Sequence, residues 1–501
     1  MSLVREAGAK AIAQFVVPTK GTWRSIAANQ LTSDALYHSQ NVFIRKGKLR
    51  SRPGLLLVND TAFDAPVIGG AMAVTPTSKM LLAVTKSRLY TLLSTDSAWA
   101  VDTAVTIAAS DNDNIDITFM ETASQYVALI AAPGQPLKKW IQGSGLTAIT
   151  AAYGTIPTAK SVCTVARRIV ALIDPHTVVW TTTLTYDNYP VLATAKLAQT
   201  NDVGICVKSL SNLSFVAYKE RSIYLARAQA GSDAGAFAFS EPLKVEGPAG
   251  VHAVVDVMGA HMYMTTNGRI AVYDGMRYPE WVADGLWFYL QDDIDPAYSN
   301  KIFGVFDYRL HTATFHYPRV GDAGLMYGAV IINLPLSNSG ISSLAPFLAV
   351  MSKPCSYGYE SRFNNQIDRS LLFTATADDR QSFYFDEATN TDDGTAFDCV
   401  AQTGLFPVPD MRHHHISAEI MVERADSNGS MTVYPVVSDM LENEAGTILT
   451  DKPQLIDLNI NTVQEHIGFD AATRFFGLQC EWASTSNVQY AGATLYGRLL
   501  G

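Results

Sequence analysis

The chain has 501 residues, of which 48% are hydrophobic and only 17% are charged. This apolar content can fill a sizeable core, so it excludes wholesale disorder. The formal net charge is −10. A dedicated duplex-DNA-binding protein is normally basic, so the composition argues against nucleic-acid binding by the whole chain. The five cysteines are scattered without a CxxC pair, which predicts reduced thiols and neither a disulfide framework nor a zinc site.

The charge is unevenly distributed along the chain. Residues 1–60 contain nine basic and three acidic residues, so the remainder carries all of the acidic excess. This contrast predicts a basic N-terminal arm over residues 1–60 that contacts another molecule. No apolar run is typical of a signal peptide or a membrane span, because the longest uncharged stretch, 323–352, is interrupted by Asn, Pro and Ser. We therefore expect a soluble protein that is made in the cytoplasm.

From residue 61 onward one hairpin-like pattern recurs, with an apolar run, a short turn and a second, alternating run. The first apolar residue of each second run falls at Leu89, Leu137, Val178, Ile223, Ile270 and Ala313, at intervals of 48, 41, 45, 47 and 43 residues. A seventh copy places Phe383 after a further 70 residues, which we interpret as an insertion. Four short strands in roughly 40–50 residues is the period of a β-propeller blade. The intervals thus predict a propeller of about six or seven blades over residues 61–400, with an irregular β-sandwich as the alternative.

After residue 400 the repeating pattern ends. Longer strands are expected there, such as ISAEIMVER and RFFGLQCEWAS, separated by polar loops. Longer alternating strands are typical of two packed antiparallel sheets. We therefore predict a C-terminal antiparallel β-sandwich over residues 401–501, and an all-β fold for the chain as a whole.

Three polar clusters could suggest catalysis or metal binding. Residues 413–415 are three histidines, but a strand would place only two of them on one face, fewer than zinc requires. Segment 111–116 is rich in Asp and Asn but lacks the Gly and Glu of a calcium-binding EF loop. Segment 391–397 resembles the Asp-boxes of sialidase propellers, with Phe397 in place of Trp. Nothing pairs two carboxylates as glycoside hydrolysis requires, and no P-loop or GxSxG is present. We predict no enzymatic activity, no cofactor and no metal site.

The segment 41–54, NVFIRKGKLRSRPG, resembles an N-terminal signature of the tail nozzle (tail tubular hub) and packaged-DNA stabilisation proteins of short-tailed bacteriophages. Further strings are similar to that family in the same order: VVWT with YDNYP, KERSIY, NGRI with YDG, and FDYR with FHYP. Thr181 stands where the family usually has Ser. The resemblance covers most of residues 40–330. Towards the C-terminus it weakens, and only a slight similarity is left at 474–477.

This resemblance implies a structural protein of the virion tail. Such proteins form a ring, usually of six copies, below the portal and adaptor, and the ring encloses the channel that retains and ejects the genome. DNA would pass without sequence-specific binding, and an acidic body would repel phosphate and let it slide. The alternative function is a carbohydrate-binding or carbohydrate-hydrolysing propeller, itself virion-associated or not, in which some of the 22 Tyr and seven Trp would stack on sugars.

The candidate contact residues are five cations in the arm: Arg45, Lys46, Lys48, Arg50 and Arg52. On an extended strand the last four would share one face. We hypothesise that they contact acidic residues of a neighbouring subunit or of the adaptor, because guanidinium groups pair well with carboxylates. A phosphate-contacting stripe in the channel and a solvated edge that deters strand pairing are the open alternatives.

Overall fold

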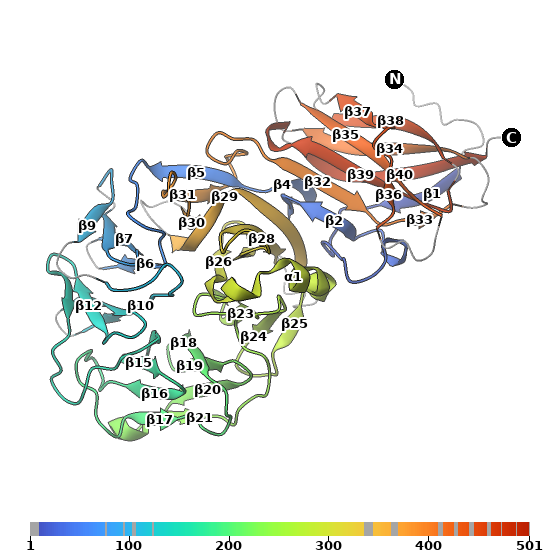
Figure 1. Ribbon diagram of the computed structural model, residues 1–501. Helices are drawn as coiled ribbons and strands as arrows, with labels where there is room; N and C mark the ends of the chain where they lie inside the picture. Colours follow the sequence, from blue (N-terminus) through green and yellow to red (C-terminus); the bar gives the residue numbers. More distant parts are fainter. Residues whose placement is uncertain are drawn as a thin grey trace.

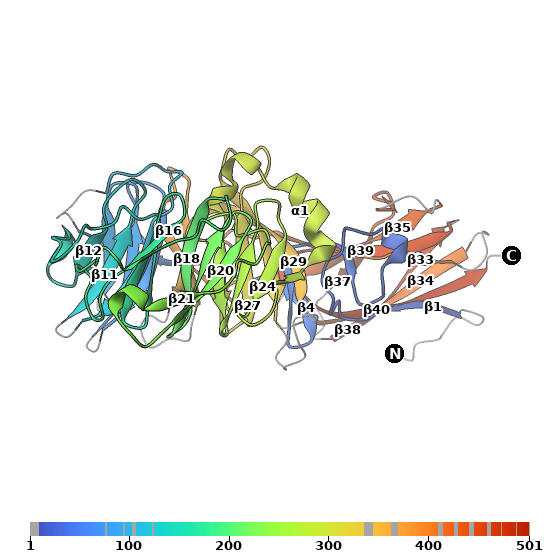
Figure 2. The same ribbon diagram turned by 90° about the horizontal axis from the view of Figure 1, so that it is seen from below.

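The computed structural model describes residues 10–75, 78–93, 96–102, 107–122, 125–334, 344–361, 369–408, 414–424, 429–439, 445–457, 462–471, 473–486 and 488–499. Two parts are visible in Figure 1, a ring of small sheets and, beside it, a pair of larger packed sheets. Figure 2 shows the same two parts lying end to end in an elongated molecule. The first and last described strands, β1 (Lys10–Phe15) and β40 (Val488–Leu499), both lie in the larger sheets (Figure 1).

The ring is a β-propeller. Its first five blades are four-stranded antiparallel sheets in which the strands follow one another in sequence order. Blade 1 contains β6 (Gly69–Val74), β7 (Lys79–Val84), β8 (Leu89–Leu93) and β9 (Ala100–Asp102). Blade 2 contains β10 (Asp116–Glu121), β11 (Tyr126–Ala131), β12 (Lys138–Ile141) and β13 (Gly145–Ala148). Blade 3 contains β14 (Ser161–Val165), β15 (Arg168–Ile173), β16 (Thr177–Trp180) and β17 (Thr194–Lys196). Blade 4 contains β18 (Gly204–Ser211), β19 (Ser214–Lys219), β20 (Ile223–Ala228), the short helix η2 (Asp233–Gly235) and β21 (Phe237–Phe239). Blade 5 contains β22 (Val254–Val257), β23 (Ala260–Met264), β24 (Ile270–Tyr273) and β25 (Glu280–Val282).

Blades 6 and 7 share one long strand, β29 (Ala345–Ser361). Its first half pairs with β28 and completes blade 6, and its second half pairs with β30 and begins blade 7. Blade 6 also contains β26 (Phe303–Asp307), β27 (Thr312–Tyr317) and β28 (Met326–Asn333). Blade 7 continues with β30 (Arg369–Thr374) and β31 (Ser382–Asp386), and its outer strand is β5 (Gly54–Asn59) from the N-terminal region. The described residues thus form a seven-bladed propeller, closed by a strand from the other end of the chain.

The middle strands of the blades explain the apolar runs in the sequence. In β11, β15 and β19 nearly every side chain is buried, because each blade packs against a neighbour on both faces. Outer strands such as β17 are mostly exposed. Between blades 5 and 6 the chain forms η3 (Asp284–Leu286), helix α1 (Trp287–Asp293) and η4 (Pro296–Lys301).

The second part is a β-sandwich, and it combines strands from both ends of the chain. One sheet has the order β3-β4-β40-β34-β38, with β1 also paired to β40. The other has the order β2-β32-β39-β35-β36, with β33 on β39 and β37 on β35. The N-terminal elements are β1 (Lys10–Phe15), η1 (Ala28–Gln30), β2 (Leu36–Gln40), β3 (Val42–Arg45) and β4 (Lys48–Ser51). The C-terminal elements are β32 (Asp398–Thr403), β33 (Phe406–Pro407), β34 (His414–Arg424), β35 (Ser430–Ser438), β36 (Thr447–Ile448), β37 (Gln454–Asp457), β38 (Thr462–Ala471), β39 (Phe475–Ala483), η7 (Ser484–Ser486) and β40 (Val488–Leu499).

The alternation in the long strands matches this architecture. On β34, Ile416, Ala418 and Ile420 are buried, whereas the residues between them are only partly buried. They share a core with Val433 and Leu478 of the opposite sheet. The same hydrophobic cluster extends into blades 1, 6 and 7, so the sandwich and the propeller have a continuous core.

Two sequence-based expectations need correction. A separate arm over residues 1–60 is wrong for the described residues, because residues 10–51 supply strands of the sandwich and 54–59 close the propeller. The repeat also changes phase: Leu89, Val178 and Ile270 lie in the third strand of their blades, whereas Ala313 lies in β27, the second strand of blade 6. This phase change lengthens the interval to Phe383, which we had interpreted as an insertion alone.

Candidate functional site at the junction of sandwich and propeller

The β3–β4 hairpin carries the candidate cations, and its turn separates them. Lys46 and Gly47 have φ values of 52° and 71°, the left-handed conformation of a tight two-residue hairpin turn. Arg45 therefore lies opposite Lys48 in the register. The expectation that Lys46, Lys48, Arg50 and Arg52 share one face of a single strand is wrong, because the chain reverses at the first of them.

Arg52 is buried between the sandwich and the propeller, with 1% of its surface exposed. Its guanidinium donates two hydrogen bonds to the carboxylate of Asp392, at 2.9 and 2.6 Å. It also donates to the carbonyl of Val350 in β29 and lies 3.9 Å from the ring centre of Phe397. Burial alone would raise the pKa of Asp392, but the charge and hydrogen bonds of Arg52, together with those of Ser352, hold it below its usual value. The guanidinium of Arg52 is therefore used by contacts within the chain and is not available for a contact at the surface.

Asn41 completes this cluster. Its side-chain oxygen accepts hydrogen bonds from Arg52 Nε at 3.0 Å and from the backbone N–H of Val350 at 2.8 Å. Its side-chain nitrogen donates to the carbonyl of Asp398, in β32, at 2.7 Å. We call Asn41, Arg52, Asp392 and Phe397 the junction cluster. It joins the start of segment 41–54 to segment 391–397, two strings that we had interpreted separately in the sequence.

Close packing extends to Gly54, the last residue of the same segment. A Cβ atom at this position would lie 2.2 Å from the carbonyl oxygen of Thr391. Any side chain would push the two segments apart. The physical role of the Arg-Pro-Gly sequence is therefore to bring the chain from the sandwich into the outer strand of blade 7 alongside residues 389–391.

The remaining cations are distributed around the junction. Arg45 forms an ion pair with Glu387 at 3.1 Å, and Arg50 donates to the side chain of Gln489 in β40 at 2.9 Å. Lys48 is partly buried. Lys46 is exposed, and among the described residues the structure gives it no hydrogen-bond or ion-pair partner.

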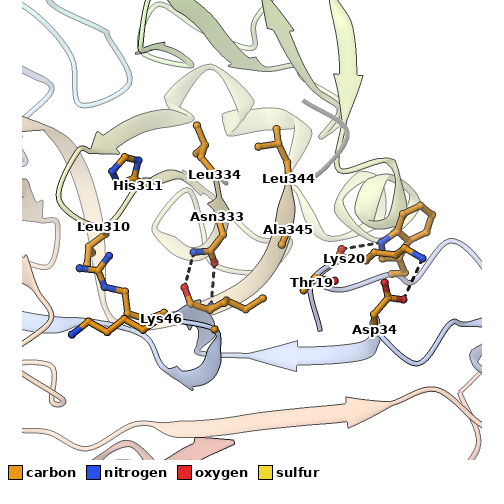
Figure 3. Close-up of a pocket in the computed structure, with 14 residues that line it drawn as sticks. Thr19, Lys20, Asp34, Lys46, Leu310, His311, Asn333, Leu334, Leu344 and Ala345 are labelled. Carbon is orange, nitrogen blue, oxygen red and sulfur yellow. Dashed lines mark hydrogen bonds and ion pairs between the residues drawn. The ribbon is translucent and has the colours of Figure 1, made fainter. Parts of the chain in front are cut away.

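A cleft of about 590 Å³ lies beside the hairpin turn, between the sandwich and blade 6 (Figure 3). Lys20 and Lys46 stand on its walls together with Leu310 and Leu334. Lys20 is paired with Asp34 at 3.2 Å. The hairpin is fixed to the propeller at this point, because the side chain of Asn333 exchanges two hydrogen bonds, of 2.8 and 3.2 Å, with the backbone of Ile44. The cleft combines apolar and charged side chains, as the surfaces of protein interfaces do.

The other polar clusters are explained by structural interactions. His413 and the side chains of His414 and His415 lie outside the described residues. Within segment 111–116, Asp111 pairs with Lys86 at 3.0 Å, whereas Asp116 is buried and accepts hydrogen bonds from Ser161 at 2.6 Å and Lys208 at 2.8 Å. Across the part of the chain that is described, no group of three or more His, Cys, Asp or Glu side chains could hold a metal ion.

The same segment also links two connections of the propeller. The side chain of Asn114 donates to the carbonyl of Asn300 at 2.8 Å, and the side chain of Asn300 donates to the carbonyl of Asn112 at 3.0 Å. This reciprocal pair joins the connection between blades 1 and 2 to the connection between blades 5 and 6. A cavity of about 60 Å³ is lined by Asn114 together with His252 and Tyr357. The two hydrogen bonds thus bring the start of blade 2 next to the start of blade 6 at this end of the propeller.

All five cysteines lie buried as free thiols. Burial raises the pKa of Cys399 to about 12, so this thiol stays protonated at neutral pH. Within the described ranges the structure contains no helix that is long and apolar enough to span a membrane.

No family model matches the sequence, and no curated protein matches it. Among solved structures, the chain is similar to BBS1N, from a crystal structure of its complex with ARL6DN, with 10% identity and a TM-score of 0.43 over 68% of this chain and 99% of that one. It is also similar to U3-55K, with 8% identity and a TM-score of 0.41 over 66% of this chain and 98% of that one. These likenesses carry no argument about function, and we assign the propeller from its strand topology.

Proposed function

We propose that this chain is a structural protein of a bacteriophage tail, of the nozzle or hub type, that assembles into a ring of six copies below the portal and adaptor. The observation that supports this proposal is the position of segment 41–54. The segment that resembles the phage signature forms the junction between sandwich and propeller and presents its basic turn, at Lys46 and Gly47, at the surface.

The proposed channel runs through the middle of the ring of subunits. The hydrogen bonds between residues 112–114 and Asn300, which join the connections of opposite blades, favour this path over one along the propeller axis. The genome would then pass between several copies of the chain. The formal net charge of −10 suits such a wall, because an acidic surface repels phosphate and keeps the affinity for DNA low.

Lys46 is the candidate for the contact with the adjacent ring. Of the five cations, Arg45 and Arg50 already bind side chains of this chain, and Arg52 is buried. The exposed ammonium of Lys46, at the rim of the apolar cleft, would meet a carboxylate of the neighbouring subunit or adaptor. A contact of this kind affects the rate of association and its salt dependence more than the final affinity.

The experiment is to measure the mass of the purified protein by sedimentation, alone and with the adaptor protein encoded by the same phage. We expect a closed ring under one of these conditions. Lys46→Glu should slow ring or adaptor association at least about tenfold at low salt, whereas Lys196→Glu, an equal charge change on the exposed strand β17, should not. A protein that stays monomeric alone and with adaptor would contradict the proposal. Equal rates for both variants would contradict the role of Lys46.

A further inference from the structure

A polar groove of about 1040 Å³ lies across blades 3, 4 and 5, far from the junction. Four connections form its walls, and all of their residues are described. They are the segments 199–202, 220–221, 244–248 and 266–267. They connect one blade to the next or join the second and third strands of a blade, so they lie on the same face of the propeller.

Buried groups hold the groove in shape. Lys219 is fully buried beneath it, and its ammonium donates to the carbonyls of Leu197 at 2.9 Å and Thr200 at 2.8 Å and pairs with Asp202 at 3.1 Å. Burial alone would raise the pKa of Asp202, but hydrogen bonds from Thr200, the backbone N–H of Arg221, Lys219 and Ser222 lower it to about 2. Asp202 is thus a structural anion and has no capacity left to act as a catalytic acid.

Unlike the buried Lys219 and Asp202, three charged side chains at the opening of the groove have no partner within the described residues. Arg221, Lys244 and Glu220 are exposed, and within the described residues their side chains have no hydrogen-bond or ion-pair partner. Glu246 is partly buried and accepts hydrogen bonds from Asn267 at 3.2 Å and Thr266 at 3.4 Å. Gln199 and Asn201 add exposed amides. The groove therefore offers donors and acceptors at many points along its length.

Hydroxyl groups, which donate and accept at once, can satisfy such a surface at every point. Two unpaired cations favour an anionic substituent, and the guanidinium of Arg221 can hold a carboxylate through two parallel hydrogen bonds. The carboxylates of Glu220 and Glu246 disfavour a continuous phosphate backbone in the same groove. We propose that this groove binds an acidic saccharide, with Arg221 and Lys244 on its carboxylate and with the amides and Glu246 on its hydroxyls.

This proposal goes beyond the tail function and does not depend on it. The probes are an oligogalacturonate, a polysialic acid fragment, a neutral maltooligosaccharide and a single-stranded oligonucleotide, each titrated calorimetrically into the intact protein. We expect binding of at least one acidic saccharide, with weaker binding of the neutral chain and the oligonucleotide. Arg221→Ala/Lys244→Ala should weaken that binding at least about tenfold. Lys196→Ala/Arg277→Ala, which removes two exposed cations outside the groove, should leave it unchanged.

Several outcomes would overturn the proposal: no binding of either acidic saccharide at millimolar concentration, equal loss of binding in the two double variants, or tighter binding of the oligonucleotide. A thermal unfolding curve of each variant excludes misfolding as the cause of a loss. A sedimentation measurement on the groove variant keeps the two proposals apart, because ring assembly should be unaffected.

Discussion

Arg52 and Arg221 both lie in connections between strands, but their surroundings differ. At the junction the guanidinium of Arg52 binds Asp392 twice, lies against Phe397 and is shielded from water. In the groove Arg221 is exposed, and within the described part of the chain its guanidinium has no partner, whereas its backbone N–H donates to Asp202. The comparison distinguishes a charge that stabilises the fold from a charge that is available to a ligand. Sequence alone does not make this distinction.

The largest expected effect is on the junction cluster. Arg52→Met should lower the free energy of unfolding by about 3–5 kcal/mol, because it leaves the carboxylate of Asp392 buried without its partner. Denaturant unfolding followed by fluorescence measures this change. Arg221→Met should change the free energy of unfolding by less than about 0.5 kcal/mol, because the side chain it removes is exposed. Equal losses in the free energy of unfolding for Arg52→Met and Arg221→Met would contradict the view that only Arg52 stabilises the fold.

Gly54→Ala tests the close approach of the two segments at the same junction. The added Cβ would lie 2.2 Å from the carbonyl oxygen of Thr391, so we expect a loss of about 1–3 kcal/mol in the free energy of unfolding. Gly235→Ala is the control, because its Cβ would meet nothing closer than 3.9 Å. A Gly54→Ala protein as stable as the control would show that segment 389–391 can move away without cost.

The third prediction concerns acid pH. Burial and the nearby charge of Arg52 lower the pKa of His316 from its ordinary value of 6.5 to about 3. Below about pH 6.5 this histidine is therefore protonated in the unfolded chain but stays neutral in the folded chain. The free energy of unfolding falls as the pH falls. Between pH 6.5 and 5 this histidine should cost roughly 1–2 kcal/mol.

His316→Phe retains a ring against Phe303, which His316 stacks on at 4.7 Å between ring centres. It should flatten the decline of the melting temperature between pH 6.5 and 5. His176→Phe, at the partly exposed turn between β15 and β16, should flatten it less, because lighter burial lowers the pKa of His176 less than that of His316. An unchanged pH profile in His316→Phe would mean that His316 is already protonated in the folded protein.

The propeller and the sandwich were predictable because both depend on local patterns. Buried middle strands produce apolar runs in the sequence. Leu89, Val178 and Ile270 mark equivalent positions, each in the third strand of its own blade. The pairing of β5 with β31 was not predictable, since these strands are far apart in sequence and neither contains a local sign of its partner. For the same reason the N-terminal strands were mistaken for an arm.

The candidate site was predicted only in part. The sequence indicated that residues 45–52 were important, but the left-handed turn at Lys46 and Gly47 and the burial of Arg52 changed their meaning. The available signals were Asp392 and Phe397 of segment 391–397, which we had compared only with the Asp-boxes of sialidase propellers. The groove in blades 3–5 was missed because its side chains come from four connections whose proximity depends on the propeller closing.

The shared strands have a consequence for synthesis of the protein on the ribosome. Arg50 in β4 and its partner Gln489 in β40 are separated by 439 positions. At a ribosomal rate of about 5–20 residues per second, β4 waits roughly 20–90 s for β40. During this interval the N-terminal strands have unpaired edges, which other chains can pair with. A chain that stops before residue 382 lacks both β31 and β40, so it has neither a closed ring of blades nor a complete sandwich.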